Sequence, residues 1–143
     1  MDWIIKAANE RNAATQRHQR LREDAPRIWE EVQKAINDAI VFYRKLPGPS
    51  NINVSSPGSI DEMVVAAFDE PERERESVAI KFERSIPQIT ARFSRDKSSS
   101  LAFPIVLNSS ERAHLTGLPG SPGKNPAEAL SERLLKSLFF PKA

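Results

Sequence analysis

Apolar residues recur at steps of three and four along residues 26–46, which is the spacing of one face of an α-helix. Proline suits the first turn of such a helix, because the N–H that it lacks would be unpaired there, so we expect the helix to begin at Pro26. Pro47-Gly48-Pro49 then ends it. The pattern predicts a helix from Pro26 to Leu46, and its apolar face is interpreted as core packing rather than as the wall of a ligand pocket. The members of this face are Ile28, Trp29, Val32, Ala35, Ile36, Ala39, Ile40 and Tyr43.

The segment before Pro26 has helical propensity but little to bury, since Leu21 is its only large apolar residue between Lys6 and Asp24. One helix over residues 2–46 would be about 68 Å long, whereas a compact chain of this size has a diameter of roughly 37 Å. The sequence therefore predicts an N-terminal helical arm at residues 1–25, either projecting or folded back as a helical hairpin. Residues 26–143 are expected to form a single domain.

Beyond residues 47–59, a linker rich in Pro, Gly and Ser, the apolar period changes to two. Segments 77–84 and 89–94 alternate apolar and polar residues, as antiparallel strands with one solvated face do. Residues 60–68 and 101–107 are further strands, with a weaker one at 110–116. Pro104 cannot donate to a ladder and indicates an edge position or a bulge. Because the turns between them are short, we expect an antiparallel meander of four to five strands.

A C-terminal helix follows an irregular loop at residues 117–125. Asn125 is placed to cap its first turn, with Pro126 at the first helical position and Glu128 at the third. The predicted fold class is therefore α+β: a long N-terminal helix or helical hairpin, the antiparallel meander and a C-terminal helix around one core.

Composition narrows the chemistry that this chain can perform. The 143 residues contain no cysteine and only two histidines, which argues against thiolate catalysis, Cys-ligated zinc and His-rich metal sites. We expect no cofactor, metal or catalytic residue, and an enzymatic function is not favoured. No run of about 18 apolar residues predicts a membrane span, and a cytoplasmic location is the default expectation. The net charge of +2 points to no particular partner.

The leading hypothesis is a non-catalytic interaction module that self-associates through its N-terminal helices. The predicted arm is too long and too poor in apolar residues to belong inside its own domain, so its tip needs cover from elsewhere. A second copy is the simplest source, which predicts a homo-oligomer and in the first instance a dimer. The candidate interaction surface consists of Trp3, Ile4, Ile5, Arg17, Arg20 and Leu21.

The sequence leaves two alternative functions open. A small polar or anionic ligand, conceivably a substrate, could bind the solvated face of the sheet, where His114 could transfer protons near neutral pH. Nucleic acid could bind the arginines of the arm, although the low net charge and the lack of a recognition motif do not favour it. The candidate residues on the sheet face are Lys81, Thr90, Arg92, Arg112 and His114.

Overall fold

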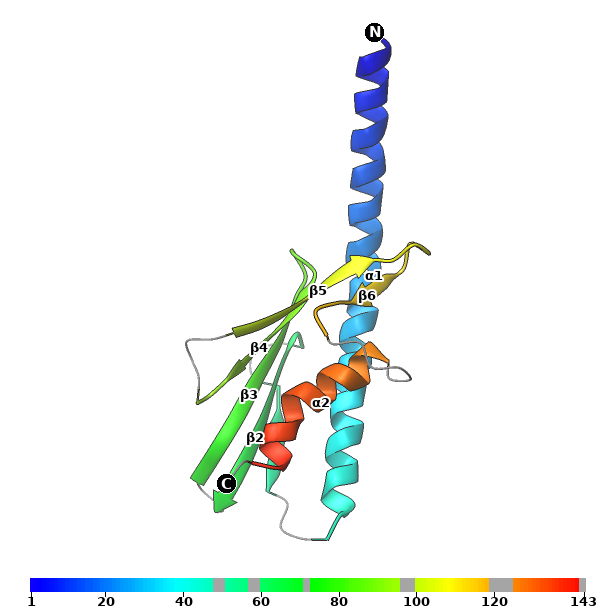
Figure 1. Ribbon diagram of the computed structural model, residues 1–143. Coiled ribbons are helices and arrows are strands. Elements are labelled where there is room, and N and C mark those ends of the chain that lie inside the picture. Colours follow the sequence, from blue (N-terminus) through cyan, green and yellow to red (C-terminus); the bar gives the residue numbers. More distant parts are fainter. Residues whose placement is uncertain (48–50, 57–59, 71–72, 96–99, 119–124, 142–143) are drawn as a thin grey trace.

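The computed structural model describes residues 1–47, 51–56, 60–70, 73–95, 100–118 and 125–141 of the chain. Two helices flank a meander of strands in chain order (Figure 1). The elements are α1 (Asp2–Lys45), β1 (Ile52–Ser55), β2 (Glu62–Glu70), β3 (Arg73–Glu83), β4 (Gln88–Phe93), β5 (Ser100–Leu107), β6 (Ala113–Leu115) and α2 (Pro126–Phe139).

The predicted α+β class is confirmed, but the sheet has six strands in the order β1-β2-β3-β4-β5-β6 instead of four to five. The additional strand, β1, lies inside the predicted linker at residues 47–59. It pairs antiparallel with β2, from Ile52 opposite Ala67 to Ser55 opposite Val64, and Ile52 is buried. Four residues are too few to show an alternating pattern, so this strand is defined by its pairing with β2 and not by its composition.

The alternation in β3 and β4 sorts the side chains onto two faces of a curled sheet, as predicted. The inner face carries the apolar residues of each strand, and α1 and α2 both pack against it to enclose one core. The sheet contributes Ile52, Met63, Val65, Ala67, Val78, Ile80, Phe82, Ile89, Ala91, Phe103, Ile105, Ala113 and Leu115; the helices contribute Ala25, Ile28, Trp29, Val32, Ile36, Ile40, Ala127, Leu130, Leu134, Leu135 and Leu138.

Helix α1 runs without interruption from Asp2 to Lys45, so the expectation that a helix begins at Pro26 is wrong. Pro26 lies in the interior of the helix and deprives the carbonyl of Arg22, four residues earlier, of its usual N–H partner. Ala25, Ile28 and Trp29 are buried immediately around it, and this packing offsets the lost hydrogen bond. Of the two arrangements considered for the N-terminal residues, the helix projects from the rest of the molecule (Figure 1).

Two further local predictions have different outcomes. Asn125 caps α2 as expected, its side-chain oxygen accepting the N–H of Glu128 at 2.8 Å. Pro104 is not on an edge strand, since β5 lies between β4 and β6. It lies where the partner of β5 changes from β4 to β6, and its carbonyl accepts the N–H of Thr116 at 2.9 Å. Residues 119–124 of the predicted loop lie outside the described residues.

Candidate interaction surfaces

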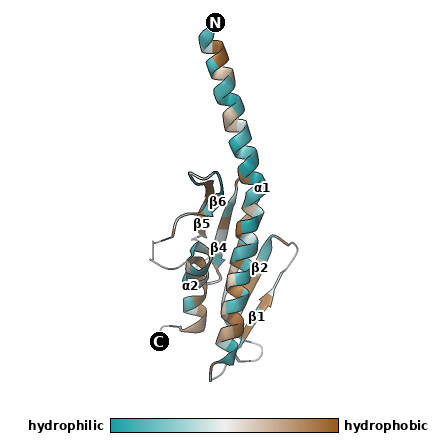
Figure 2. Ribbon diagram, turned by 90° about the vertical axis from the view of Figure 1, so that its right-hand side faces the viewer, coloured by the Kyte–Doolittle hydropathy of each residue, from teal (hydrophilic) through white to brown (hydrophobic). Residues whose placement is uncertain are grey.

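Residues 2–20 of α1, the exposed segment, are solvent-exposed at every position. Trp3, Ile4 and Ile5 at its tip are 72%, 45% and 61% exposed, and Figure 2 shows apolar residues near the tip of a projecting half-helix that is otherwise mostly polar. The first contacts with the rest of the molecule come at Arg17 and Arg20, which both pair with Glu111. Most helical stability in proteins comes from tertiary packing, so the exposed segment would gain stability from a partner that covers it.

The side of α1 that bears Ile28 and Leu21 extends into the exposed segment, where small and apolar residues are interspersed with Arg17 and Glu10. Seven residues make about two turns of an α-helix, so Ala7, Ala14, Leu21 and Ile28 lie along one line, and Trp3 falls one turn before Ala7. Ile28 is buried and Leu21 is half-buried against the core, whereas the residues before them are exposed. The face that binds the sheet in the second half of the helix therefore has no cover in the first half.

The candidate surface predicted from the sequence divides into two groups. Trp3, Ile4 and Ile5 form the exposed tip, and Leu21 lies about 27 Å away along the helix. Arg17 and Arg20 lie near Leu21 and face Glu111, with Arg17 Nη1 3.9 Å from its carboxylate. The structure thus brings the three tip residues together, and separately the two arginines and Leu21.

A clamp fixes α1 to the sheet where the exposed segment ends. The Arg27 guanidinium donates to both oxygens of Asp24, at 3.0 and 2.9 Å, and the N–H of Ala113 in β6 donates to Asp24 Oδ2 at 2.8 Å. Arg27 also donates to the carbonyl of Ala113 at 2.9 Å. Hydrogen bonding from Arg27, with help from Ala113, lowers the pKa of Asp24 from 3.8 to about 2. These hydrogen bonds hold α1 against β6 at the point where the exposed segment begins to project.

The turn between β5 and β6 supplies the sheet side of this junction. Asn108 Oδ1 accepts the N–H groups of Ser110 and Arg112 at 2.9 and 3.1 Å, which closes the turn. Glu111 adopts a φ of 60° there, in the left-handed region that non-glycine residues seldom occupy. This conformation places the Glu111 carboxylate against Arg17 and Arg20.

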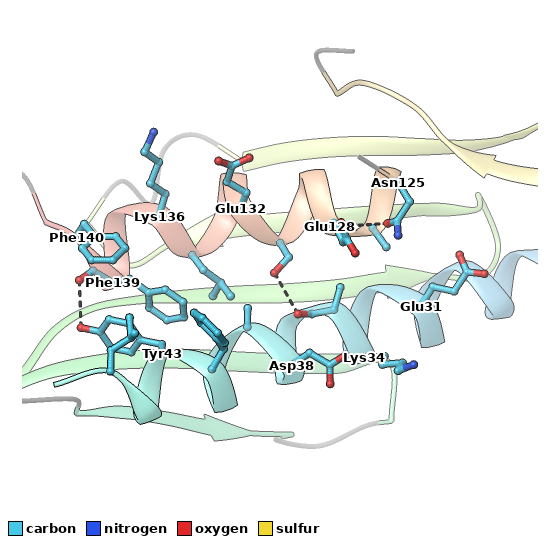
Figure 3. Close-up of a pocket in the computed structure, with 17 residues that line it drawn as sticks. Glu31, Lys34, Asp38, Tyr43, Asn125, Glu128, Glu132, Lys136, Phe139 and Phe140 are labelled. Atoms are coloured by element: carbon cyan, nitrogen blue, oxygen red, sulfur yellow. Dashed lines mark hydrogen bonds between the residues drawn. The ribbon is translucent and has the colours of Figure 1, made fainter. Parts of the chain in front are cut away.

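A groove of about 910 Å³ lies between α1 and α2 (Figure 3). Its middle is lined by the small residues Ala35, Ala39, Ala127 and Ser131, which leave open space between the two helices. Ser131 Oγ donates to the carbonyl of Ala35 at 3.4 Å, so the helices are joined beneath that space. We name this feature the α1/α2 groove.

One end of the α1/α2 groove is aromatic. Tyr43 stacks on Phe139 with 4.2 Å between ring centroids and meets Phe140 edge-on at 5.9 Å. Tyr43 Oη donates to the carbonyl of Phe139 at 3.2 Å. Phe42 and Phe140 also line the groove and are 67% and 64% exposed; contiguous exposed apolar patches mark binding sites more often than isolated exposed residues do.

The rim of the α1/α2 groove carries charge of both signs, with an acidic excess. Glu31 also holds Arg27 of its own chain, at 2.9 Å. The remaining rim residues come from both helices, as Figure 3 shows. The carboxylates are Glu31, Asp38, Glu128 and Glu132, and the cations are Lys34 and Lys136.

Sequence reasoning missed this groove, because it interpreted the face around Trp29 and Tyr43 as core packing. Trp29 is indeed buried, stacked near Phe82, and its indole N–H donates to the carbonyl of Ile60 at 3.1 Å. Tyr43 packs against the core, as predicted, and also lines the groove. The available signal was the pair Ala35 and Ala39, whose small side chains lie on the face where bulky residues would fill a core.

The residues predicted for the solvated sheet face fall at two separate places. Lys81 lies opposite Thr90 on neighbouring strands, and Arg92 is two residues from Thr90 on the same face. His114 pairs with Val106 on the far side of β5, roughly 16 Å from Thr90 by strand spacing and rise. The structure therefore brings together the β3 and β4 residues but not His114. Arg112 lies in the turn before β6, where its N–H bonds to Asn108.

Comparison with known protein families, with curated proteins and with solved structures found no match to this chain. In the described part of the chain, no cluster of three or more His, Asp or Glu side chains has the arrangement of a metal site. Neither described helix has the apolar length that a membrane crossing requires.

Proposed function

We propose that this chain is an interaction module that pairs with a second copy of itself through the exposed segment of α1. The observation that carries the proposal is the apolar tip of α1, where Trp3, Ile4 and Ile5 are all exposed. Ile28 and Leu21, farther along the same helix, are covered by the chain's own core, whereas the tip is not. A helix that presents its core-facing side to water gains free energy when another protein covers that side.

The apolar tips supply a free energy of the same order as the cost of association. Burial of a large apolar side chain contributes roughly 1.5–3 kcal/mol, so the three tip residues of each chain supply roughly 5 kcal/mol, less their residual burial. Two copies supply about twice this amount, which is comparable with the estimated 4–15 kcal/mol cost of association.

The test is sedimentation velocity on the full chain across a range of concentrations. We expect the wild-type chain to sediment as a dimer at micromolar concentrations and Ile4→Asp to sediment as a monomer. The matched control is Ile86→Asp, since Ile86 is 68% exposed in the turn between β3 and β4, far from α1 in the sequence; this variant should remain dimeric. A wild-type chain that is monomeric throughout would refute the proposal.

Nucleic-acid binding and ligand binding on the sheet face have less support. Arg17 and Arg20, which would contact phosphate, are engaged with Glu111. Affinity for nucleic acid would fall steeply as the salt concentration rises. A filter-binding assay at two salt concentrations would measure this dependence. His114 lies apart from Thr90 and Arg92, so the sheet face does not gather the groups that an acid–base site needs.

A further inference from the structure

We propose that α1 has a hinge at the helical turn between Arg22 and Pro26, and that Glu111, in the turn between β5 and β6, holds this hinge straight. The ion pairs of Arg17 and Arg20 with Glu111, which we call the Glu111 contact, then set the direction in which the exposed segment points. This inference goes beyond the proposed self-association and does not depend on it, since the direction of the tip matters to any partner.

The backbone of α1 has a weak point at Arg22. Because Pro26 has no N–H, the carbonyl of Arg22 lacks the hydrogen bond that joins successive turns elsewhere in the helix. Proline is one of the few causes of sharp bends in helices. The weak point also lies where the packed part of α1 ends, since residues 2–20 are exposed and Ala25 is buried.

One short stretch of the sheet holds α1 on both sides of this weak point. On the side of the packed helix, the clamp described above joins α1 to the backbone of Ala113. On the side of the tip, Arg17 and Arg20 both pair with the carboxylate of Glu111, two residues before Ala113. The two attachments therefore span the unpaired carbonyl of Arg22.

The backbone of the turn is specialised for the second attachment. Glu111 has a φ of 60°, a left-handed conformation that is uncommon for residues other than glycine. Such conformations cost free energy and persist where the surrounding structure holds them. Here Asn108 closes the turn around Glu111 by accepting two backbone N–H groups, and the Glu111 carboxylate faces α1.

The Glu111 contact is strong enough to bias the hinge and weak enough to be released. The side chains of Arg17, Arg20 and Glu111 are each about half exposed, and an exposed ion pair shifts a two-state equilibrium by about fivefold at most. Salt screens such pairs, since the Debye length falls from about 10 Å at 0.1 M to about 3 Å at 1 M. The hinge is therefore held at low ionic strength and released at high ionic strength.

A small bend at this hinge moves the tip a long way. Trp3 lies about 28 Å from Arg22 along the helix axis. A bend of about 20°, at which helix kinks count as sharp, therefore moves Trp3 by about 10 Å. Apolar contacts act over only about 4 Å, so a surface that the tip touches in the straight helix is out of its reach after the bend.

Distances between two spin labels test the hinge, because the chain has no cysteine of its own. The labels are attached to Ala7→Cys in the exposed segment and Ala79→Cys in β3, both at exposed positions of the full-length chain. Ile4→Asp and an excess of unlabelled chain remove distances between copies. We expect a narrow distribution at 0.1 M salt and, after Glu111→Gln, one broader by up to about 8 Å, the movement of residue 7 for the same bend.

The matched control is Glu23→Gln. Glu23 is a carboxylate beside the hinge that accepts a hydrogen bond from Gln19 of its own helix, so its loss should leave the distribution narrow. A parent chain that is already broad at 0.1 M salt, or a Glu111→Gln chain as narrow as its parent, would overturn the proposal. This readout is the same whether or not the wild-type chain dimerises, so failure of the proposed function is recognised separately.

Two further measurements separate release of the hinge from damage to the turn. Salt at about 1 M should broaden the parent distribution toward that of Glu111→Gln and leave Glu111→Gln unchanged. Exchange of the charges, with Glu111→Arg combined with Arg17→Glu and Arg20→Glu, should restore the narrow distribution. A parent distribution that does not respond to salt would overturn the role of the ion pairs, and so would a charge exchange that stays broad.

Pro26→Ala locates the hinge. It returns an N–H to the carbonyl of Arg22, so in the Glu111→Gln background it should narrow the distribution again. Broadening that persists in this double variant would overturn the placement of the hinge at Arg22.

Discussion

Removal of the Asp24 carboxylate tests whether the clamp fixes the root of the exposed segment. In Asp24→Ala the N–H of Ala113 and the Arg27 guanidinium each lose an anionic acceptor. The lowering of the Asp24 pKa from 3.8 to about 2 corresponds to an upper limit of about 2.4 kcal/mol. Because the Asp24 and Arg27 side chains are 30% and 33% exposed, solvent screening reduces the expected loss to about 1–2 kcal/mol.

The pH dependence gives the sharper test. The folded-state pKa of Asp24 lies below its unfolded value, so its contribution to stability is complete above pH 4 and is lost as the pH falls through about 2. At pH 3 about half of the wild-type advantage over Asp24→Ala should remain. The free energy of unfolding is measured with urea at pH 7 and pH 3, in the Ile4→Asp background so that association does not contribute.

The neighbouring carboxylate provides the control. Glu23 is exposed and accepts only a hydrogen bond from Gln19 among the contacts described for it, so Glu23→Ala should change the free energy of unfolding by less than about 0.5 kcal/mol. Equal free energies of unfolding for Asp24→Ala and its parent at pH 7 would refute the claim that the hydrogen bonds of Asp24 stabilise the fold. An advantage of unchanged size at pH 3 would refute its electrostatic origin.

Three further predictions concern the helices. Leu134 is fully buried, so Leu134→Ala should lower the free energy of unfolding by about 2–5 kcal/mol in urea titrations. Pro26→Ala restores an N–H donor for the Arg22 carbonyl and should raise the melting temperature by several degrees; a lower melting temperature would show that the helix needs the proline. In hydrogen exchange, amides of residues 5–16 should exchange rapidly in monomeric Ile4→Asp while residues 28–40 stay protected, and equal protection would contradict the lack of tertiary contacts.

Several features of this fold follow from local sequence. Alternation in β3 and β4 predicts their inner faces, and Asn125 predicts the start of α2, because each depends on residues close together in the chain. The excess length of the N-terminal helix follows from comparing its rise per residue with the diameter of the domain. That comparison holds whether or not the helix breaks at Pro26.

Other features depend on contacts that local sequence does not contain. The helix continues through Pro26 because Ala25, Ile28 and Trp29 pack around it, and packing is a property of the tertiary structure. Strand β1 exists because β2 offers an edge to pair with. The α1/α2 groove arises only where α2 crosses Ala35 and Ala39, so the sequence shows its alanines but not the space between the helices.

An unbroken α1 makes the position of its tip a function of residue count. Each inserted residue would move Trp3 about 1.5 Å outward and turn it by about 100° around the axis. Insertion of seven residues nearly restores its bearing, while insertion of two points it toward the opposite side. The number of residues in α1 therefore sets both the distance of the tip from the sheet and the direction in which its side chains point, and an insertion or deletion changes the two together.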